Sequence, residues 1–136
     1  MLVVVRGMIL SHSIPVALTT APVTVNQDMK ALLATGEVHP HYLAWMLRGL
    51  KGFLLTLVEE SGHGTKALRT DALRSAKVPL PSFEEQERIA AELAARTAHI
   101  DDVRAITRRA IKSLQEERSS LISAAVTGQF DTRIAA

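Results

Sequence analysis

Four histidines are the first residues whose chemistry invites a functional interpretation: His12, His39, His41 and His63. His39 and His41 are separated by one proline, and this spacing does not put two ligands on one face of a helix. The chain has no cysteine, and no carboxylates stand near these histidines in the order of a known metal motif. We therefore predict no metal site. We interpret the histidines instead as a helix cap and exposed loop residues.

A glycine-rich segment, residues 61–66 with the sequence SGHGTK, resembles a loop that cradles phosphate. A nucleotide-binding P-loop needs a longer spacing that ends in Gly-Lys-Ser or Gly-Lys-Thr, so nucleotide binding is not expected. Backbone N–H groups, Thr65 and Lys66 could still hold a DNA phosphate, and His63 could reach a base edge. A plain turn between two elements explains the glycines equally well.

Other polar residues lie where loops follow apolar runs, and such loops often read a DNA groove. An arginine there can bind a guanine edge through two hydrogen bonds, which discriminates by about 1–3 kcal/mol. Lysine and arginine can also contact phosphates without reading sequence. The simpler alternative is a solvated charge at a strand end. The remaining candidate DNA-binding residues are Arg6, Ser11, His12, Lys30 and Arg69.

Motifs for catalysis are missing from the sequence. It contains no glycine-rich turn arranged for S-adenosylmethionine, no Asn/Asp-Pro-Pro-aromatic methylation motif and no carboxylate–lysine set of a nuclease. Glu84, Glu85 and Glu87 fall in the first turns of a predicted helix, where the helix dipole already favours acidic residues. We predict a protein without a catalytic site or cofactor of its own.

Charge is distributed unevenly along the chain, although its net value is only +2. Residues 1–82 carry eight basic and five acidic side chains, giving +3, whereas residues 83–127 carry seven and eight, giving −1. Attraction to phosphate is therefore expected in the first part. The early apolar run is broken by Arg6-Gly7, too soon for a signal peptide or a membrane span. Together with the lack of cysteine, this predicts a soluble, cytoplasmic protein.

The region before Pro79-Leu80-Pro81 has a mixed pattern of short strands and helices. Two apolar runs, Val23–Val25 and Met29–Leu33, could continue a sheet. The second run could equally be a helix by propensity. The other expected strands are Leu2–Val5, Val16–Thr19 and Lys77–Leu80. One helix is expected to start at His39-Pro40-His41, and two short helices are expected at Phe53–Glu60 and Thr70–Ser75.

After the proline pair the sequence predicts one long helix. Ser82 and Glu85 have the spacing of a capping box, in which each side chain satisfies a free backbone N–H at the helix start. No proline or glycine follows until Gly128, which stands where a C-terminal glycine cap would. The uninterrupted stretch of residues 83–127 is about 65–70 Å long if fully helical.

Apolar residues recur every seven positions along this stretch, a pattern typical of coiled-coil packing against another long helix. Thr107, Arg96 and Glu117 interrupt the two rows, which predicts a modest zipper. Since the chain supplies one such helix, the partner must be another chain or a second copy. The predicted pairing residues are Ile89, Leu93, Ile100, Val103, Ile106, Ile111, Leu114 and Leu121.

Three strings of residues carry a resemblance to a known family. They are Val78-Pro79-Leu80-Pro81, then residues 84–90 (EEQERIA), and finally residues 121–128 (LISAAVTG). Together they closely resemble the junction and long helix of the specificity subunits of type I restriction–modification systems. Residues 3–7, 26–28, 41–43, 61–65 and Leu73 follow in the order of that family's target recognition domain.

The resemblance implies an α+β fold. Residues 1–81 would form a partial target recognition domain, 82–128 a coiled-coil spacer helix and 129–136 a tail. It also implies a DNA-reading function on double-stranded DNA with a split site. The partners would be methyltransferase subunits and restriction subunits bound through them. The seven-residue repeat adds a second copy paired through the helix. S-adenosylmethionine, ATP and magnesium would belong to the partners. The alternative is a coiled-coil module that dimerises or docks modification subunits without reading DNA.

Overall fold

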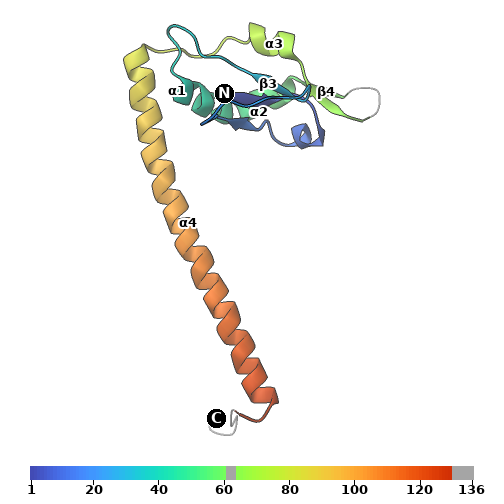
Figure 1. Ribbon diagram of the computed structural model, residues 1–136, viewed down its shortest axis with the longest axis vertical. Helices are drawn as coiled ribbons and strands as arrows, with labels where there is room; N and C mark the ends of the chain where they lie inside the picture. The colour runs from blue at the N-terminus through green and yellow to red at the C-terminus, as the bar shows by residue number, and fades with distance from the viewer. Residues whose placement is uncertain (61–63, 130–136) are drawn as a thin grey trace. The chain divides into compact units, whose positions relative to one another are not determined.

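A small antiparallel sheet forms the centre of the folded part of the chain, and one long helix forms its C-terminal part (Figure 1). The computed structural model describes residues 1–60 and 64–129. The chain divides into two compact units, Met1–Leu93 and Ala94–Ala136. The predicted α+β class with a long helix is confirmed.

The sheet has the strand order β2-β1-β3. Its central strand β1 (Leu2–Val4) pairs antiparallel with β2 (Val16–Ala17) and with β3 (Met29–Ala31). Both expected N-terminal strands are present but shorter than predicted. The ambiguous run after Met29 is a strand in its first three residues, whereas Val23–Val25 is not a strand.

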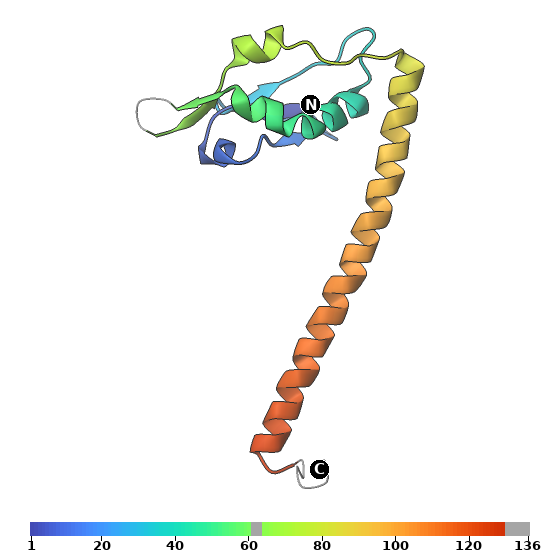
Figure 2. The same ribbon diagram turned by 180° about the vertical axis from the view of Figure 1, so that it is seen from behind.

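Two consecutive helices cover one face of this sheet, as the opposite views of Figures 1 and 2 show. They are α1 (Pro40–Gly49) and α2 (Lys51–Thr56). Side chains alternate across a strand, so the inward-facing set of the sheet meets the apolar stripe of the helices. The buried cluster consists of Val3, Val5, Leu10, Ile14, Val16, Ala44, Leu47, Leu54 and Leu68.

A β-hairpin follows α2 and corrects one prediction. The expected helix Phe53–Glu60 ends at Thr56, and the next residues form strand β4 (Val58–Glu60), which pairs with β5 (Lys66–Leu68). The backbone N–H of Leu68 donates to the Val5 carbonyl at 2.8 Å, so β5 is also hydrogen-bonded to the residue that follows β1. Pairing with distant backbone groups thus overrides the local helical preference.

Short helices complete the first unit. The predicted turn at Thr70–Ser75 is helix α3, and an unpredicted 3-10 turn, η1 (Met8–Ser11), follows β1. The expected strand Lys77–Leu80 is wrong, because that segment has no strand partner. Pro79 lacks the N–H that a strand must donate. Its carbonyl instead accepts a hydrogen bond from the Tyr42 hydroxyl at 3.0 Å.

Helix α4 (Phe83–Val126) begins and ends close to the predicted residues and has 44 residues, about 66 Å. The Ser82 hydroxyl accepts from the Glu85 N–H at 3.3 Å, which is half of the predicted capping box. The Glu85 carboxylate binds Arg88 instead. At the other end, Gly128 has a φ of 74°, and its N–H donates to the Ala125 carbonyl. This is the glycine cap that the sequence predicts.

Candidate nucleic-acid interface

One end of the first unit brings several predicted DNA-binding residues together. Gly7 donates its N–H to the Lys66 carbonyl at 2.9 Å, and Arg6 forms a β-bridge with Ala67. These contacts hold η1 beside strand β5, which Figures 1 and 2 both show. Gly7 has a φ of 131°, a conformation that glycine adopts without strain. The predicted residues at this end are Arg6, Ser11, His12, Thr65 and Lys66.

Two of the predicted phosphate contacts are already paired with acids. Lys66 forms an ion pair with Glu60, its cross-strand neighbour in the hairpin. Arg69 lies 3.3 Å from the Glu59 carboxylate and 3.4 Å from that of Asp71. These cations therefore have to exchange an intramolecular partner for a phosphate if they contact DNA.

Contacts in this region also lower the pKa values of two acidic side chains. The hydrogen bond and charge of Lys66 lower the pKa of Glu60 below its ordinary value. The Ala72 backbone N–H and then Arg69 lower the pKa of Asp71. Both carboxylates therefore stay ionised at neutral pH, and their negative charge lies beside the cations.

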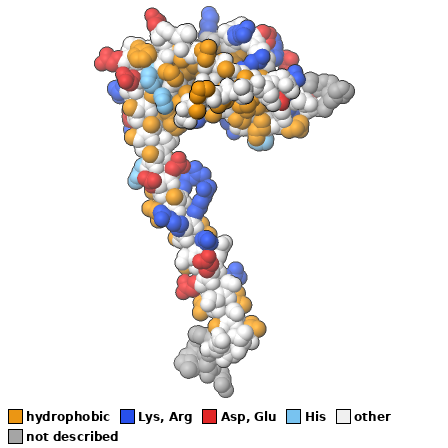
Figure 3. Space-filling model, viewed as in Figure 1, with side chains coloured by type: hydrophobic (Ala, Val, Ile, Leu, Met, Phe, Trp, Pro, Cys, Tyr) orange, Lys and Arg blue, Asp and Glu red, His pale blue; other side chains and the backbone are white. Residues whose placement is uncertain are grey.

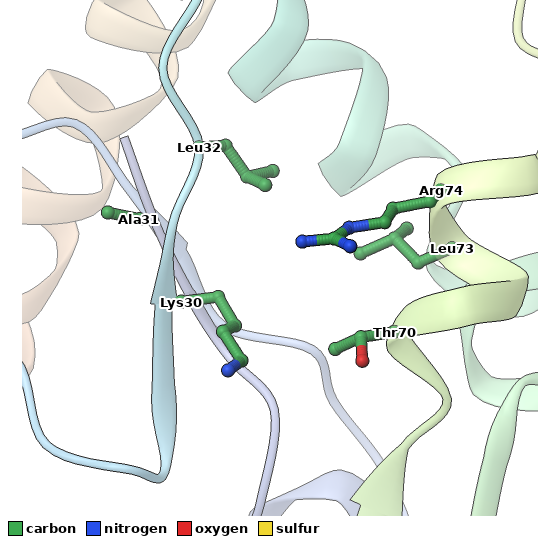
Figure 4. Close-up of a pocket in the computed structure, with 6 residues that line it drawn as sticks. All are labelled: Lys30, Ala31, Leu32, Thr70, Leu73 and Arg74. Atoms are coloured by element: carbon green, nitrogen blue, oxygen red, sulfur yellow. The ribbon is translucent and has the colours of Figure 1, made fainter.

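Arg6 and Lys30 differ from Lys66 and Arg69, since neither is ion-paired within residues 1–60 and 64–129. Both side chains are exposed. Lys30 lies on β3 and lines a hollow with residues of α3 (Figure 4). His63 lies outside the described residues.

His39 and His41 lie close together, with their ring centroids 5.7 Å apart. No group of three His, Cys, Asp or Glu side chains in the described part of the chain could hold a metal ion. His39 caps α1, where its Nδ1 accepts from the Tyr42 N–H at 3.4 Å. The interpretation of His39 as part of a helix cap is confirmed.

Gln86 is a positioning residue that the sequence analysis did not single out. Its side chain is fully buried, and its Nε2 donates to the carbonyls of Glu37 and Pro81, each at 2.9 Å. Its Oε1 accepts from the His39 N–H at 2.9 Å. These bonds fix the first turns of α4 to the loop before α1. A signal existed, because Gln86 shares a helix face with Ile89, Ala90 and Leu93.

Beyond these turns, α4 leaves its apolar stripe open. Ile106 is 59% exposed and Leu114 is 64% exposed, and the other predicted pairing residues from Ile100 onward are about half exposed. Ile89, by contrast, is half-buried within the first unit. An apolar row of this length is typical of a helix that pairs with another.

Basic side chains gather midway along α4, as Figure 3 shows. Arg104 pairs with Asp101 at 3.1 Å, and Lys112 lies 3.7 Å from Glu116. These two cations are therefore balanced by acids on the helix itself. No helix in the described part of the chain is long and apolar enough to cross a membrane.

Comparison with known proteins assigns this arrangement to a family. The family described as "Type I restriction modification DNA specificity domain" matches residues 5–112, most of the chain. The chain belongs to this family. The match covers the first unit from residue 5 onward and continues well into α4. The resemblance predicted from the three sequence strings is confirmed.

A named relative agrees with the family. The specificity subunit of the Escherichia coli type I restriction enzyme EcoR124I/EcoR124II is 33% identical over 87 residues, which is 64% of this chain. The matched part is 22% of that subunit's length, so the specificity domain described here spans a minor part of the relative. No solved structure gives a significant match.

Proposed function

We propose that this chain reads part of a split DNA site for a type I restriction–modification complex and scaffolds its methyltransferase subunits. The observation that carries the proposal is the family match, which spans both the unit with the candidate interface and much of α4. A recognition unit joined to a long helix suits a protein that must hold DNA and protein partners at a fixed separation.

DNA reading is assigned to the end of the first unit that carries Arg6, with Ser11 and His12 on the adjacent turn. Arg6 is exposed and without an ion pair in the described ranges, so its five donors are available to a guanine edge. Thr65 and Lys66 lie next to it and would contact backbone phosphate. The sheet edge fixes their positions, which reduces the entropy lost on binding.

Scaffolding is assigned to α4. Its open apolar stripe would pair with the same helix of a second copy and help to dock methyltransferase subunits, with restriction subunits joining through them. The chemistry would take place on those partners, together with S-adenosylmethionine, ATP and magnesium. In this role the chain contributes no catalytic group.

A second candidate function is a coiled-coil module that docks modification subunits without reading DNA. One observation favours it: Lys66 and Arg69 are held by Glu60, Glu59 and Asp71, which weakens the positive field where DNA would lie. The two candidates agree on the role of α4 and differ only at the DNA interface.

A salt titration of duplex DNA binding separates them. The full chain is measured alone and with its methyltransferase subunit, on duplexes of different sequence. DNA reading predicts that some duplexes bind much more tightly than others at every salt concentration. Equal binding of all duplexes, or none, with the methyltransferase still bound would leave only the docking module.

A further inference from the structure

A hollow of about 310 Å³ lies between strand β3 and helix α3. Leu32 and Leu73 contribute apolar surface, whereas Lys30, Thr70 and Arg74 contribute polar groups. In Figure 4 the Arg74 guanidinium reaches from α3 toward β3, and Lys30 leans from β3 toward Thr70. Two cations from elements far apart in sequence thus face one space.

No acid balances these two cations. Within residues 1–60 and 64–129, neither Lys30 nor Arg74 takes part in an ion pair. The nearby Asp71 carboxylate is bound to Arg69. Two like charges that face one hollow repel each other, and an anion between them would relieve that repulsion. Among the residues that line the hollow, the sequence analysis had offered only Lys30 as a phosphate contact and gave no role to Thr70 or Arg74.

We propose that this hollow binds a backbone phosphate of DNA, with the adjoining deoxyribose against Leu32 and Leu73. Arg74 offers a planar fork that matches two phosphate oxygens, Lys30 adds a mobile charge, and the Thr70 hydroxyl adds a donor. The volume exceeds what a phosphate alone needs and leaves room for the sugar. This inference rests on the proposed DNA-reading function and names a second contact, separate from Arg6, that anchors the unit on the duplex.

The test measures how binding of random-sequence duplex DNA depends on salt, with the full chain bound to its methyltransferase subunit. Phosphate contacts act on every sequence, so the recognised site need not be known. The variants are Lys30→Gln, Arg74→Gln and the double substitution. Lys51→Gln is the matched control, because Lys51 is exposed on α2 and does not line the hollow.

The double variant should lower the slope of log K against log salt by about 0.9, the value for one phosphate contact. The same relation gives about an eightfold loss of affinity at 0.1 M salt. Each single variant should lose part of this, and Lys51→Gln little. Arg74→Lys keeps the charge and should keep the slope. Unfolding followed by Trp45 fluorescence should be unchanged in all variants.

Several outcomes would overturn the proposal. If the double variant has the same slope as Lys51→Gln, the hollow does not bind a phosphate. DNA binding by the wild-type protein would still support the DNA-reading function. A loss of about 1.8 in the double variant would mean two separate contacts and not one shared phosphate. Loss of methyltransferase binding at an unchanged slope would make the hollow a protein contact. Wild-type protein that binds no DNA would remove the proposed function as well.

Discussion

Replacing Gln86 by leucine tests how the start of α4 is attached to the rest of the first unit. Leucine has a similar volume, so the change leaves packing nearly intact and removes three hydrogen bonds of 2.9 Å each. The His39 N–H and the carbonyls of Glu37 and Pro81 then lose their partner in a partly buried place. At about 1 kcal/mol for each net bond the loss is about 3 kcal/mol, and apolar burial of leucine offsets part of it.

We therefore expect Gln86→Leu to lower the free energy of unfolding by about 2–3 kcal/mol. Trp45 is the only tryptophan and lies on α1, so its fluorescence reports the first unit during urea denaturation. Protein concentration is held constant, because pairing through α4 would add to apparent stability. The midpoint should fall without a change in the denaturant slope.

Gln115→Leu is the matched control, since Gln115 is exposed on the same helix. Surface substitutions of this kind change stability by less than about 0.5 kcal/mol. If Gln86→Leu shifts the midpoint no more than Gln115→Leu does, the Gln86 side chain does not hold the helix start, and the attachment described here is wrong.

Three further predictions concern the helix, the junction and pH. Leu114→Glu places a charge in the open apolar stripe of α4, so it should shift the protein to monomers in sedimentation equilibrium. The control Ser119→Glu on the same helix should not. A Leu114→Glu protein that is still a dimer would show that pairing uses another surface. Tyr42→Phe removes the hydroxyl that donates to the Pro79 carbonyl and should cost about 1 kcal/mol by urea denaturation, and no loss would mean that this bond is matched by water. The pKa of Glu60 is lowered in the folded state, so the Glu60 carboxylate contributes fully to folding stability above its ordinary pKa of 4.5. This contribution is lost as the pH falls through the pKa of the folded state, so Glu60→Gln should flatten the acid side of a plot of unfolding free energy against pH. An identical plot for the variant would refute the contact with Lys66.

Local signals allowed α4 to be predicted closely. Ser82 at the start, Gly128 at the end and no proline or glycine between them define a helix through neighbouring residues alone. The same holds for the cap at His39. The segment after Thr56 was predicted wrongly because its structure depends on hairpin partners six to ten residues away, which local propensity does not contain.

The candidate site was harder to predict than the fold. Residue types suggested Lys66 and Arg69 as phosphate contacts, but only the hairpin register places Glu60 opposite Lys66. The hollow needs β3 and α3 to lie side by side, and these are about forty residues apart in the sequence. Gln86 looked like one polar residue among many until its three backbone partners were known.

The most direct test of the account is the pattern of DNA methylation in cells that express the full chain with its methyltransferase subunit. Methylated bases are mapped across the genome by sequencing that detects the modification. The account predicts methylation confined to one split motif, lost or relaxed at specific positions when Arg6 is replaced by Gln. Methylation that is absent or unrelated to sequence, or a motif that Arg6→Gln leaves unchanged, would contradict DNA reading by this chain at the Arg6 end.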